Sequence, residues 1–260
     1  MNATSGRHAV DPYATDLVAE TDLLAALLAG ADPSLDVPTC PGWSVAQLLR
    51  HVGRGHRWAA QMVASGADEV LDPREVVGGK PPDPDPEAAA QWLRDGATEL
   101  LDAVVAAGPD APVWTFTGPK PAAWWIRRRV HEATVHRADA ALALGVPFEI
   151  TPATAADGIS EWLDLLAARP AAEEPPLPEG RTLHLHATDD GLGTAGEWTV
   201  RGADGRVTWE HGHAKGDAAV RASAADLLQG VLRRIPADDD RLQVFGDTAL
   251  WRDWLARTGF

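Results

Sequence analysis

The sequence has little of what secreted and membrane-spanning proteins need. Cys40 is its only cysteine, so the chain cannot form an intramolecular disulfide. No segment approaches the roughly 18 consecutive apolar residues of a membrane-spanning helix, because Asp, Glu and Arg interrupt the Leu- and Ala-rich stretches. The first eight residues also lack the apolar core of a signal peptide. We therefore expect a cytoplasmic protein without a membrane partner.

Positive charge is scarce as well. The 260 residues include 23 Lys and Arg against 38 Asp and Glu, which gives a formal net charge of −15. This charge repels nucleic acid at long range, so no nucleic-acid partner is expected. The hydrophobic and charged fractions, 45% and 23%, are typical of a globular protein. The length exceeds the usual size of a single core, which favours two domains.

Several catalytic motifs are missing too. The sequence contains no GxxxxGK[ST] phosphate loop, no GxGxxG turn after a predicted strand and no GxSxG nucleophile elbow. Cys40 precedes Pro41 at the entrance of a predicted helix. A buried or turn-filling role for this thiol therefore competes with a nucleophilic one.

Helical periodicity dominates the first two thirds of the chain. Apolar residues recur at helical spacing, Ser44 occupies an N-cap position, and a Pro-rich connection covers residues 72–86. The predicted helices span residues 11–29, 44–63, 86–107, 123–144 and 154–168. The Pro- and Glu-rich stretch 170–180 has the composition of an interdomain linker.

Beyond residue 180 the apolar period changes from helical to two, which predicts β-strands. The alternating pairs are Leu183/Leu185, Trp198/Val200, Val207/Trp209 and Ala218/Val220. Two predicted helices, 223–235 and 247–258, follow them. The expected fold is thus a helical domain over 1–169 and a small α+β domain over 181–260, with an antiparallel sheet and two helices.

The most informative cluster lies in the segment from 131 to 136. Glu132 and His136 are four residues apart and project from the same helix face. His131 lies roughly 140° around the helix from His136 and cannot share an ion with it. His51 and His56 could supply a third ligand, and because they are five residues apart only one of them should do so. The apolar stripe of their helix favours His56.

Two histidines and a glutamate with an open coordination position are typical of catalytic zinc. Nickel, iron and cobalt suit the same donors. A Glu and a His at this spacing also occur on solvated helix surfaces, where they bind nothing.

Two stretches carry a family resemblance: Thr39 to Val52, TCPGWSVAQLLRHV, and Glu132 to Ala140, EATVHRADA. They resemble the signature segments of the mycothiol-dependent maleylpyruvate isomerase family. That family combines a DinB-like metal-binding four-helix bundle with a C-terminal domain similar to sterol carrier protein. The resemblance covers essentially the whole chain and implies this fold for it.

The resemblance also implies the site. It assigns the metal ligands to His51, Glu132 and His136, in place of His56, with zinc or another divalent ion as the metal. It implies mycothiol as the thiol cosubstrate, which would explain why no protein nucleophile is evident.

Arginines are the candidates for holding substrate carboxylates or the cosubstrate. The resemblance implies a functional arginine in the second domain, either Arg233 or Arg234. Arg54, Arg57 and Arg128 are further candidates, although Arg57 and Arg128 could equally form surface ion pairs.

The expected function is zinc-dependent chemistry with a low-molecular-weight thiol. It is either cis–trans isomerisation of a maleylpyruvate-like acid or transfer of the thiol to an electrophilic small molecule. The alternative is a non-catalytic small-molecule carrier with a residual metal site. The expected partner is an electrophilic or dicarboxylic small molecule, and the expected assembly is a monomer or small homo-oligomer.

Four further histidines lie in the predicted strands and turns of the second domain. His184 and His186 share one sheet face, and His211 and His213 repeat the same spacing. They could hold a second metal. The absence of an adjacent carboxylate motif favours a polar sheet surface instead.

Overall fold

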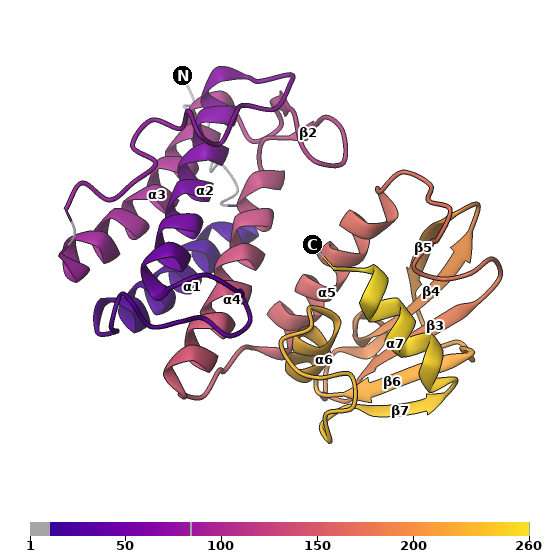
Figure 1. Ribbon diagram of the computed structural model, residues 1–260. Coiled ribbons are helices and arrows are strands. Elements are labelled where there is room, and N and C mark those ends of the chain that lie inside the picture. Colours follow the sequence, from indigo (N-terminus) through magenta and orange to yellow (C-terminus); the bar gives the residue numbers. More distant parts are fainter. Residues whose placement is uncertain (1–10, 84, 260) are drawn as a thin grey trace, which may run out of the picture. The chain divides into compact units, whose positions relative to one another are not determined.

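The computed structural model describes residues 11–83 and 85–259 (Figure 1). The chain divides into two compact units, the first ending at Pro147 and the second beginning at Phe148. Within the described ranges, no helix has the length and apolar character that crossing a membrane requires.

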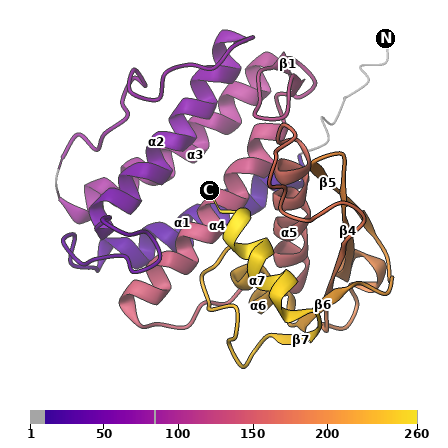
Figure 2. The same ribbon diagram turned by 45° about the vertical axis from the view of Figure 1, so that its right-hand side comes forward.

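The first unit is a bundle of four long helices. They are α1 (Pro12–Ala29), α2 (Val45–Ser65), α3 (Pro86–Ala107) and α4 (Trp124–Leu144). The helix α2 packs along α3, and α1 packs against α4 and α3 (Figures 1 and 2). A small hairpin precedes α4, made of β1 (Pro112–Val113) and β2 (Lys120–Pro121). The predicted four-helix bundle is confirmed, and the hairpin was not predicted.

The start of α2 follows directly from the sequence. Ser44 is its N-cap, with the side chain accepting from the backbone of Gln47, while the Gln47 side chain accepts from the backbone N–H of Ser44. This reciprocal capping box satisfies two backbone donors that the first helical turn leaves unpaired. It fixes the point at which the preceding loop turns into the helix that carries His51.

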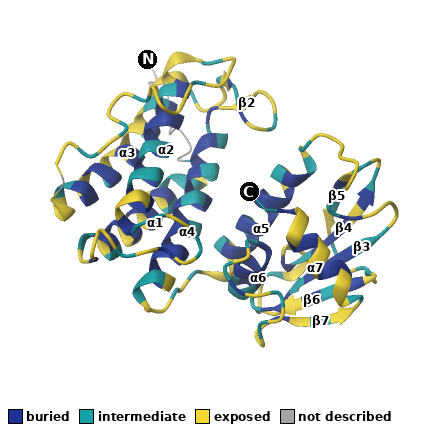
Figure 3. Ribbon diagram, viewed as in Figure 1, coloured by how far each residue is buried: buried dark blue, intermediate teal, exposed yellow. Residues whose placement is uncertain are grey.

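A buried ion pair joins the first and last helices of the bundle. The Arg137 guanidinium on α4 donates to both carboxylate oxygens of Glu20 on α1, at 2.8 and 3.1 Å. Both residues are buried. Both helices carry buried positions along their length (Figure 3). The bundle is therefore held by a two-point charged contact as well as by apolar packing.

The second unit is a five-stranded sheet with helices on one face (Figures 1 and 2). Its elements are α5 (Pro152–Ala167), β3 (Thr182–Ala187), η1 (Gly193–Gly196), β4 (Glu197–Ala203), β5 (Arg206–His211), β6 (Ala218–Ala222), α6 (Ala224–Val231), β7 (Gln243–Gly246) and α7 (Thr248–Arg257). The strand order is β5-β4-β3-β6-β7. The strands β3 and β6 pair in parallel. The expected sheet is confirmed, but it is mixed and not antiparallel, and β7 was missed.

The helix α5 belongs to the second unit, which moves the boundary from the predicted linker at 170–180 to Pro147. Its apolar face shares one core with the sheet, and the Trp198 indole donates to the Ser160 hydroxyl at 2.9 Å. Leu177 of the predicted linker is itself buried in this core. The Pro-rich composition thus marks a connection inside the second unit, which has three helices where two were expected.

Candidate metal centre

His51, Glu132 and His136 come together between α2 and α4. His51 Nε2 lies 3.5 Å from Glu132 Oε2, and His136 Nε2 lies 3.6 Å from the same oxygen. The three ligand atoms all lie within 4.8 Å of one another. Donor atoms around a tetrahedral zinc are about 3.4 Å apart, because zinc–nitrogen and zinc–oxygen bonds are about 2.1 Å long. The donor spacing and chemistry therefore fit a divalent ion.

A buried carboxylate orients His136. Asp139 lies one turn further along α4 with 0% exposure, and its Oδ2 is 2.8 Å from His136 Nδ1. A proton held on Nδ1 by this contact leaves the lone pair of Nε2 directed toward Glu132 and His51. The Thr39 hydroxyl donates to Asp139 Oδ1 at 2.6 Å, which holds the carboxylate in place. Metal-binding histidines typically have such a carboxylate partner.

The loop formed by residues 36–44 makes one wall of the centre. Its ends pair through a bridge between Asp36 and Ser44. The Trp43 ring lies 4.8 Å from the His51 ring and 6.2 Å from the His136 ring, measured between centroids. The His51 side chain is 35% exposed and that of His136 only 11%. Small molecules can therefore reach the centre from the His51 side.

Cys40 belongs to the same loop and is half-buried. Its thiol points to Asp139 Oδ2 at 3.5 Å, so it contacts the carboxylate that orients His136. Of the two roles weighed for this residue, the structure supports the turn-filling one.

Positive charge surrounds the glutamate. Arg128 contacts Glu132 Oε1, and Arg129 Nη1 lies 3.5 Å from Glu132 Oε2. Burial, followed by the nearby charges of His136 and Arg129, lowers the pKa of His51 to about 3. His51 is therefore neutral near pH 7, which leaves its lone pair available to a metal.

His56, which periodicity favours as a ligand, lies outside this donor cluster. It is fully buried, as the pattern predicts. Its Nδ1 accepts from Arg129 Nε at 3.2 Å, and its Nε2 lies 3.3 Å from the Thr21 hydroxyl. Burial lowers the pKa of His56 well below its usual value, and Arg129 and Arg57 add to the effect. The ring supports Arg129, which in turn contacts Glu132.

Gly55 makes room for this support. A Cβ at this position would lie 2.6 Å from Arg129 Nη2, so any other residue would displace the guanidinium. With glycine there, Arg129 reaches across α2 and donates to the Val52 carbonyl at 3.1 Å. The two helices that carry the metal donors are thereby tied together next to the centre.

The arrangement can be compared with known proteins. Residues 14–141 match the family model described as the mycothiol maleylpyruvate isomerase N-terminal domain. Residues 153–253 match the model of the C-terminal domain of the same enzymes. The chain belongs to the mycothiol maleylpyruvate isomerase family. No curated protein matches the sequence.

Solved structures of the family share the fold. A crystal structure of a mycothiol-dependent maleylpyruvate isomerase is 17% identical, with a TM-score of 0.59, and the match covers 89% of this chain and 91% of that one. A His-to-Ala mutant of such an enzyme is 16% identical with a TM-score of 0.57 and the same coverage. At this identity the likeness concerns the two-domain fold alone.

The three arginines of the first unit that were expected to contact the cosubstrate differ in burial and in their partners. Arg128 contacts Glu132, and Arg54 lies half-buried one turn after His51. Arg57 is 4% exposed, pairs with Glu99 at 3.0 Å and stacks over Trp92 at 4.4 Å. These contacts place Arg57 within the α2–α3 interface, and its expected role in cosubstrate binding stays a prediction.

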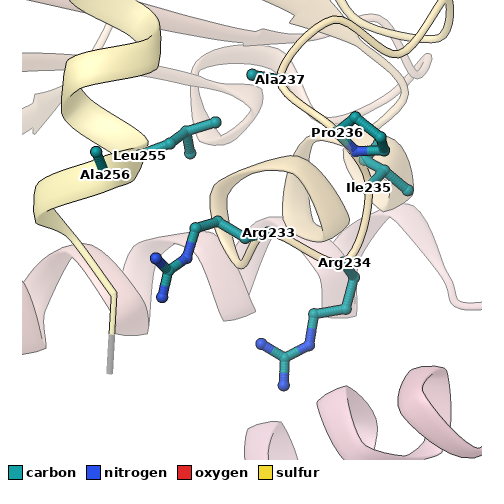
Figure 4. A pocket seen from close by; sticks show the side chains of 7 residues that line it. All are labelled: Arg233, Arg234, Ile235, Pro236, Ala237, Leu255 and Ala256. Carbon is teal, nitrogen blue, oxygen red and sulfur yellow. The ribbon is translucent and has the colours of Figure 1, made fainter. Parts of the chain in front are cut away.

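The second-unit arginines line a hollow of about 440 Å³ at the end of α6 (Figure 4). The other lining residues are Ile235, Pro236, Ala237, Leu255 and Ala256. Arg233 has a left-handed backbone with a φ of 59°. Arg234 donates to the Leu232 carbonyl at 2.8 Å. The structure thus places both arginines at one hollow, and the functional role of one of them stays a prediction.

Sequence reasoning did not assign Asp139 or Trp43. A signal for Asp139 was present, because it follows His136 by three residues and therefore lies on the same helix face. The position of Trp43 depends on the path of the 36–44 loop, which no local pattern encodes.

Proposed function

We propose that this protein is a metal-dependent enzyme that uses a low-molecular-weight thiol, mycothiol, as its cosubstrate. The observation that carries the proposal is the donor cluster of His51, Glu132 and His136, backed by the buried Asp139. Membership of the family adds the thiol and the substrate class. The donors suit zinc, which when bound supplies the Lewis acidity that stabilises a thiolate at neutral pH.

The protein's own groups have distinct roles in this proposal. Asp139 holds a proton on His136 Nδ1, and burial keeps His51 neutral, so both imidazoles present lone pairs. Arg128 and Arg129 fix the Glu132 carboxylate and offset its charge. Trp43 covers one side of the centre and excludes water from it.

The proposed reaction is the cis–trans isomerisation of a maleylpyruvate-like acid. The thiolate sulfur adds to one carbon of the cis double bond, and the π electron pair moves onto the conjugated carbonyl to give an enolate. The former double bond is then a single bond that can rotate. Elimination of the same thiol then restores the double bond in the trans form, so atoms and electrons balance without an oxidant. Arg54, which is half-buried and lies one turn after His51 on α2, is our candidate for holding a substrate carboxylate.

Thiol transfer to an electrophile shares the first step and differs only in that the adduct is not eliminated. The two reactions are separated by their products. With maleylpyruvate, an isomerase returns all of the thiol, whereas a transferase consumes one thiol for each turnover.

The test combines metal content with turnover in untagged protein. Elemental analysis should show that the His51→Ala/His136→Ala double variant loses one equivalent of zinc per chain. It should also lose mycothiol-dependent isomerisation of maleylpyruvate. His211→Ala is the matched control, because His211 is exposed on a strand of the second unit, and it should keep both.

Two outcomes would contradict the proposal. The double variant could bind as much zinc as the unaltered chain, which would remove the donor assignment. Alternatively, the fully loaded chain could turn over neither maleylpyruvate nor electrophiles with mycothiol, which would favour the small-molecule carrier.

A further inference from the structure

The sheet of the second unit has a polar face that the family's chemistry does not explain. Leu183 and Leu185 of β3 are buried in the core shared with the helices. His184 and His186 alternate with them and therefore lie on the opposite face. In the register of the sheet, His186 pairs with Glu197 of β4. The cross-strand neighbour supplies the carboxylate that is missing next to the histidines in the sequence.

A third residue completes the group. His213, in the loop after β5, has its Nδ1 2.7 Å from Glu197 Oε2, and His184 Nε2 lies 3.0 Å from the same oxygen. The ring centroids of His184 and His213 are 4.9 Å apart. His184, Glu197 and His213 thus place their ligand atoms within 4.8 Å of one another. We call them the sheet cluster.

We propose that the sheet cluster is a second binding site for a divalent transition metal of the zinc type. Its donor set, two imidazoles and one carboxylate, is the same as that of the bundle centre. No group of the cluster is shared with that centre, so the inference is independent of the proposed enzyme activity.

The hydrogen bonds of the cluster favour this assignment. Two imidazole nitrogens converge on one carboxylate oxygen, and an ion at that point would exchange two N–H protons for two nitrogen lone pairs. Donor atoms must separate from 2.7 and 3.0 Å to about 3.4 Å for a tetrahedral ion. His213 can supply this movement, because its side chain is 73% exposed and belongs to a loop.

Burial makes the other side of the cluster rigid. His184 is 4% exposed, and the loop after β5 approaches it at Gly216. A Cβ at Gly216 in that loop would lie 2.5 Å from the carbonyl oxygen of Ala218 and 3.0 Å from the backbone nitrogen of His184. The close approach therefore requires glycine at this position. An ion bound here would fasten the loop to β3 and β4, which is a structural role.

His186 is the nearest further donor. Its ring centroid lies 5.9 Å from that of His184 and 6.4 Å from that of His213. His211, although two residues from His213, packs its ring against Trp198 and Trp209. It pairs with Trp198 in the register, so it lies on the opposite face of the sheet and provides the matched control.

The test uses the full untagged chain with His51→Ala and His136→Ala, so that the bundle centre does not contribute. Cobalt(II) and zinc are the probes. Visible absorption should report one equivalent of cobalt in a site that zinc displaces. Adding His211→Ala should leave this binding unchanged, whereas adding His213→Ala should weaken it at least ~10-fold, since losing a ligand costs no less than losing its supporting residue.

Folding is monitored by circular dichroism, and exposed His213 is the variant least disruptive to the core. A Glu197→Gln variant provides an independent second measurement and should weaken binding in the same way. The proposal is overturned if the background variant binds no cobalt or zinc, or if its affinity is the same with and without His213.

Discussion

The two histidine–glutamate groups of this protein have the same donors and very different surroundings. In the bundle, the donor atoms are 3.5 and 3.6 Å apart, and a separate buried carboxylate, Asp139, orients one of the histidines. In the sheet cluster, the donor atoms are 2.7 and 3.0 Å apart and hydrogen-bond one another. Neighbouring side chains therefore keep the donor atoms of the bundle centre apart, while the donor atoms of the sheet cluster form hydrogen bonds with one another.

The two sites differ in the polar groups that surround them. The bundle centre is surrounded by a buried polar network in which Arg129 links His56 to Glu132, and Glu20 holds Arg137. Such groups are costly to bury unless every partner is in place. Metal donors that are held in place and accessible from one side are typical of a catalytic site. Donors that hydrogen-bond one another between a sheet and a loop are better suited to a structural site.

The largest effect should come from breaking the buried pair of the bundle. Arg137→Met leaves the Glu20 carboxylate buried without its guanidinium, which should lower the free energy of unfolding of the first unit by about 3–5 kcal/mol. Hydrogen exchange of the α1 and α4 amides measures this. The Glu20→Leu/Arg137→Met double variant should regain most of the loss, and Arg181→Met in the second unit, at an exposed ion pair, should leave α1 and α4 unchanged. A single variant as stable as the double one would contradict the role of the pair.

A smaller effect is expected from removing the support of His136. Asp139→Ala should weaken zinc binding at the bundle centre about 10–100-fold, because the imidazole loses its orienting partner. Zinc competition with a chromophoric chelator provides the measurement, and excess zinc should restore turnover. The sheet cluster should keep its affinity in the same variant. Equal losses at both sites would show that Asp139 acts on the whole fold and not on His136.

Acid should destabilise the bundle through His56. Its folded-state pKa lies well below the usual value, so the unfolded chain takes up the proton first as the pH falls below about 6.5. The contribution of His56 to the free energy of unfolding is therefore fully present above that pH. It decreases below that pH by up to about 1.4 kcal/mol per pH unit for one proton. Urea unfolding of the metal-free chain at pH 7 and pH 5.5 should show a smaller pH difference for His56→Gln. If the difference in the free energy of unfolding between pH 7 and pH 5.5 is the same in this variant, groups other than His56 cause the acid destabilisation.

The smallest effect concerns an exposed pair of the second unit. Hydrogen bonds from the side chain and backbone of Arg241 lower the pKa of Asp239 to about 2. Its stabilising contribution is present above the ordinary aspartate pKa and is lost as the pH falls through that of the folded state. Arg241→Gln should move the carboxyl titration, followed by NMR, toward the ordinary value while barely changing stability. An unmoved titration would show that the backbone bond alone sets it.

The sequence alone predicts the helices of the bundle well, because apolar periodicity, Ser44 and the prolines act locally. It also places Glu132 and His136 on one helix face. Apolar periodicity could not decide between His51 and His56, because it predicts which residue is buried and not which one binds a metal. Family resemblance pointed to His51, and the structure brings His51 and not His56 into the donor cluster.

The failures are those of long-range pairing. Glu197 was overlooked because its partner His184 is thirteen residues away and joins it only through the register of β3 and β4. The helix α5 was assigned to the wrong domain because the Pro-rich stretch after it resembles a linker. The contacts of Arg57 with Glu99 and Trp92 were likewise not predicted, because they depend on how α3 packs against α2.

The 36–44 loop has a consequence for how this protein can diverge. Trp43 lies against the His51 ring of the proposed centre, while Thr39 and Cys40 contact the carboxylate that orients His136. A mutation selected in this loop for a new substrate therefore also alters metal retention. Under the proposed function, substrate range and metal affinity are therefore coupled through this one loop.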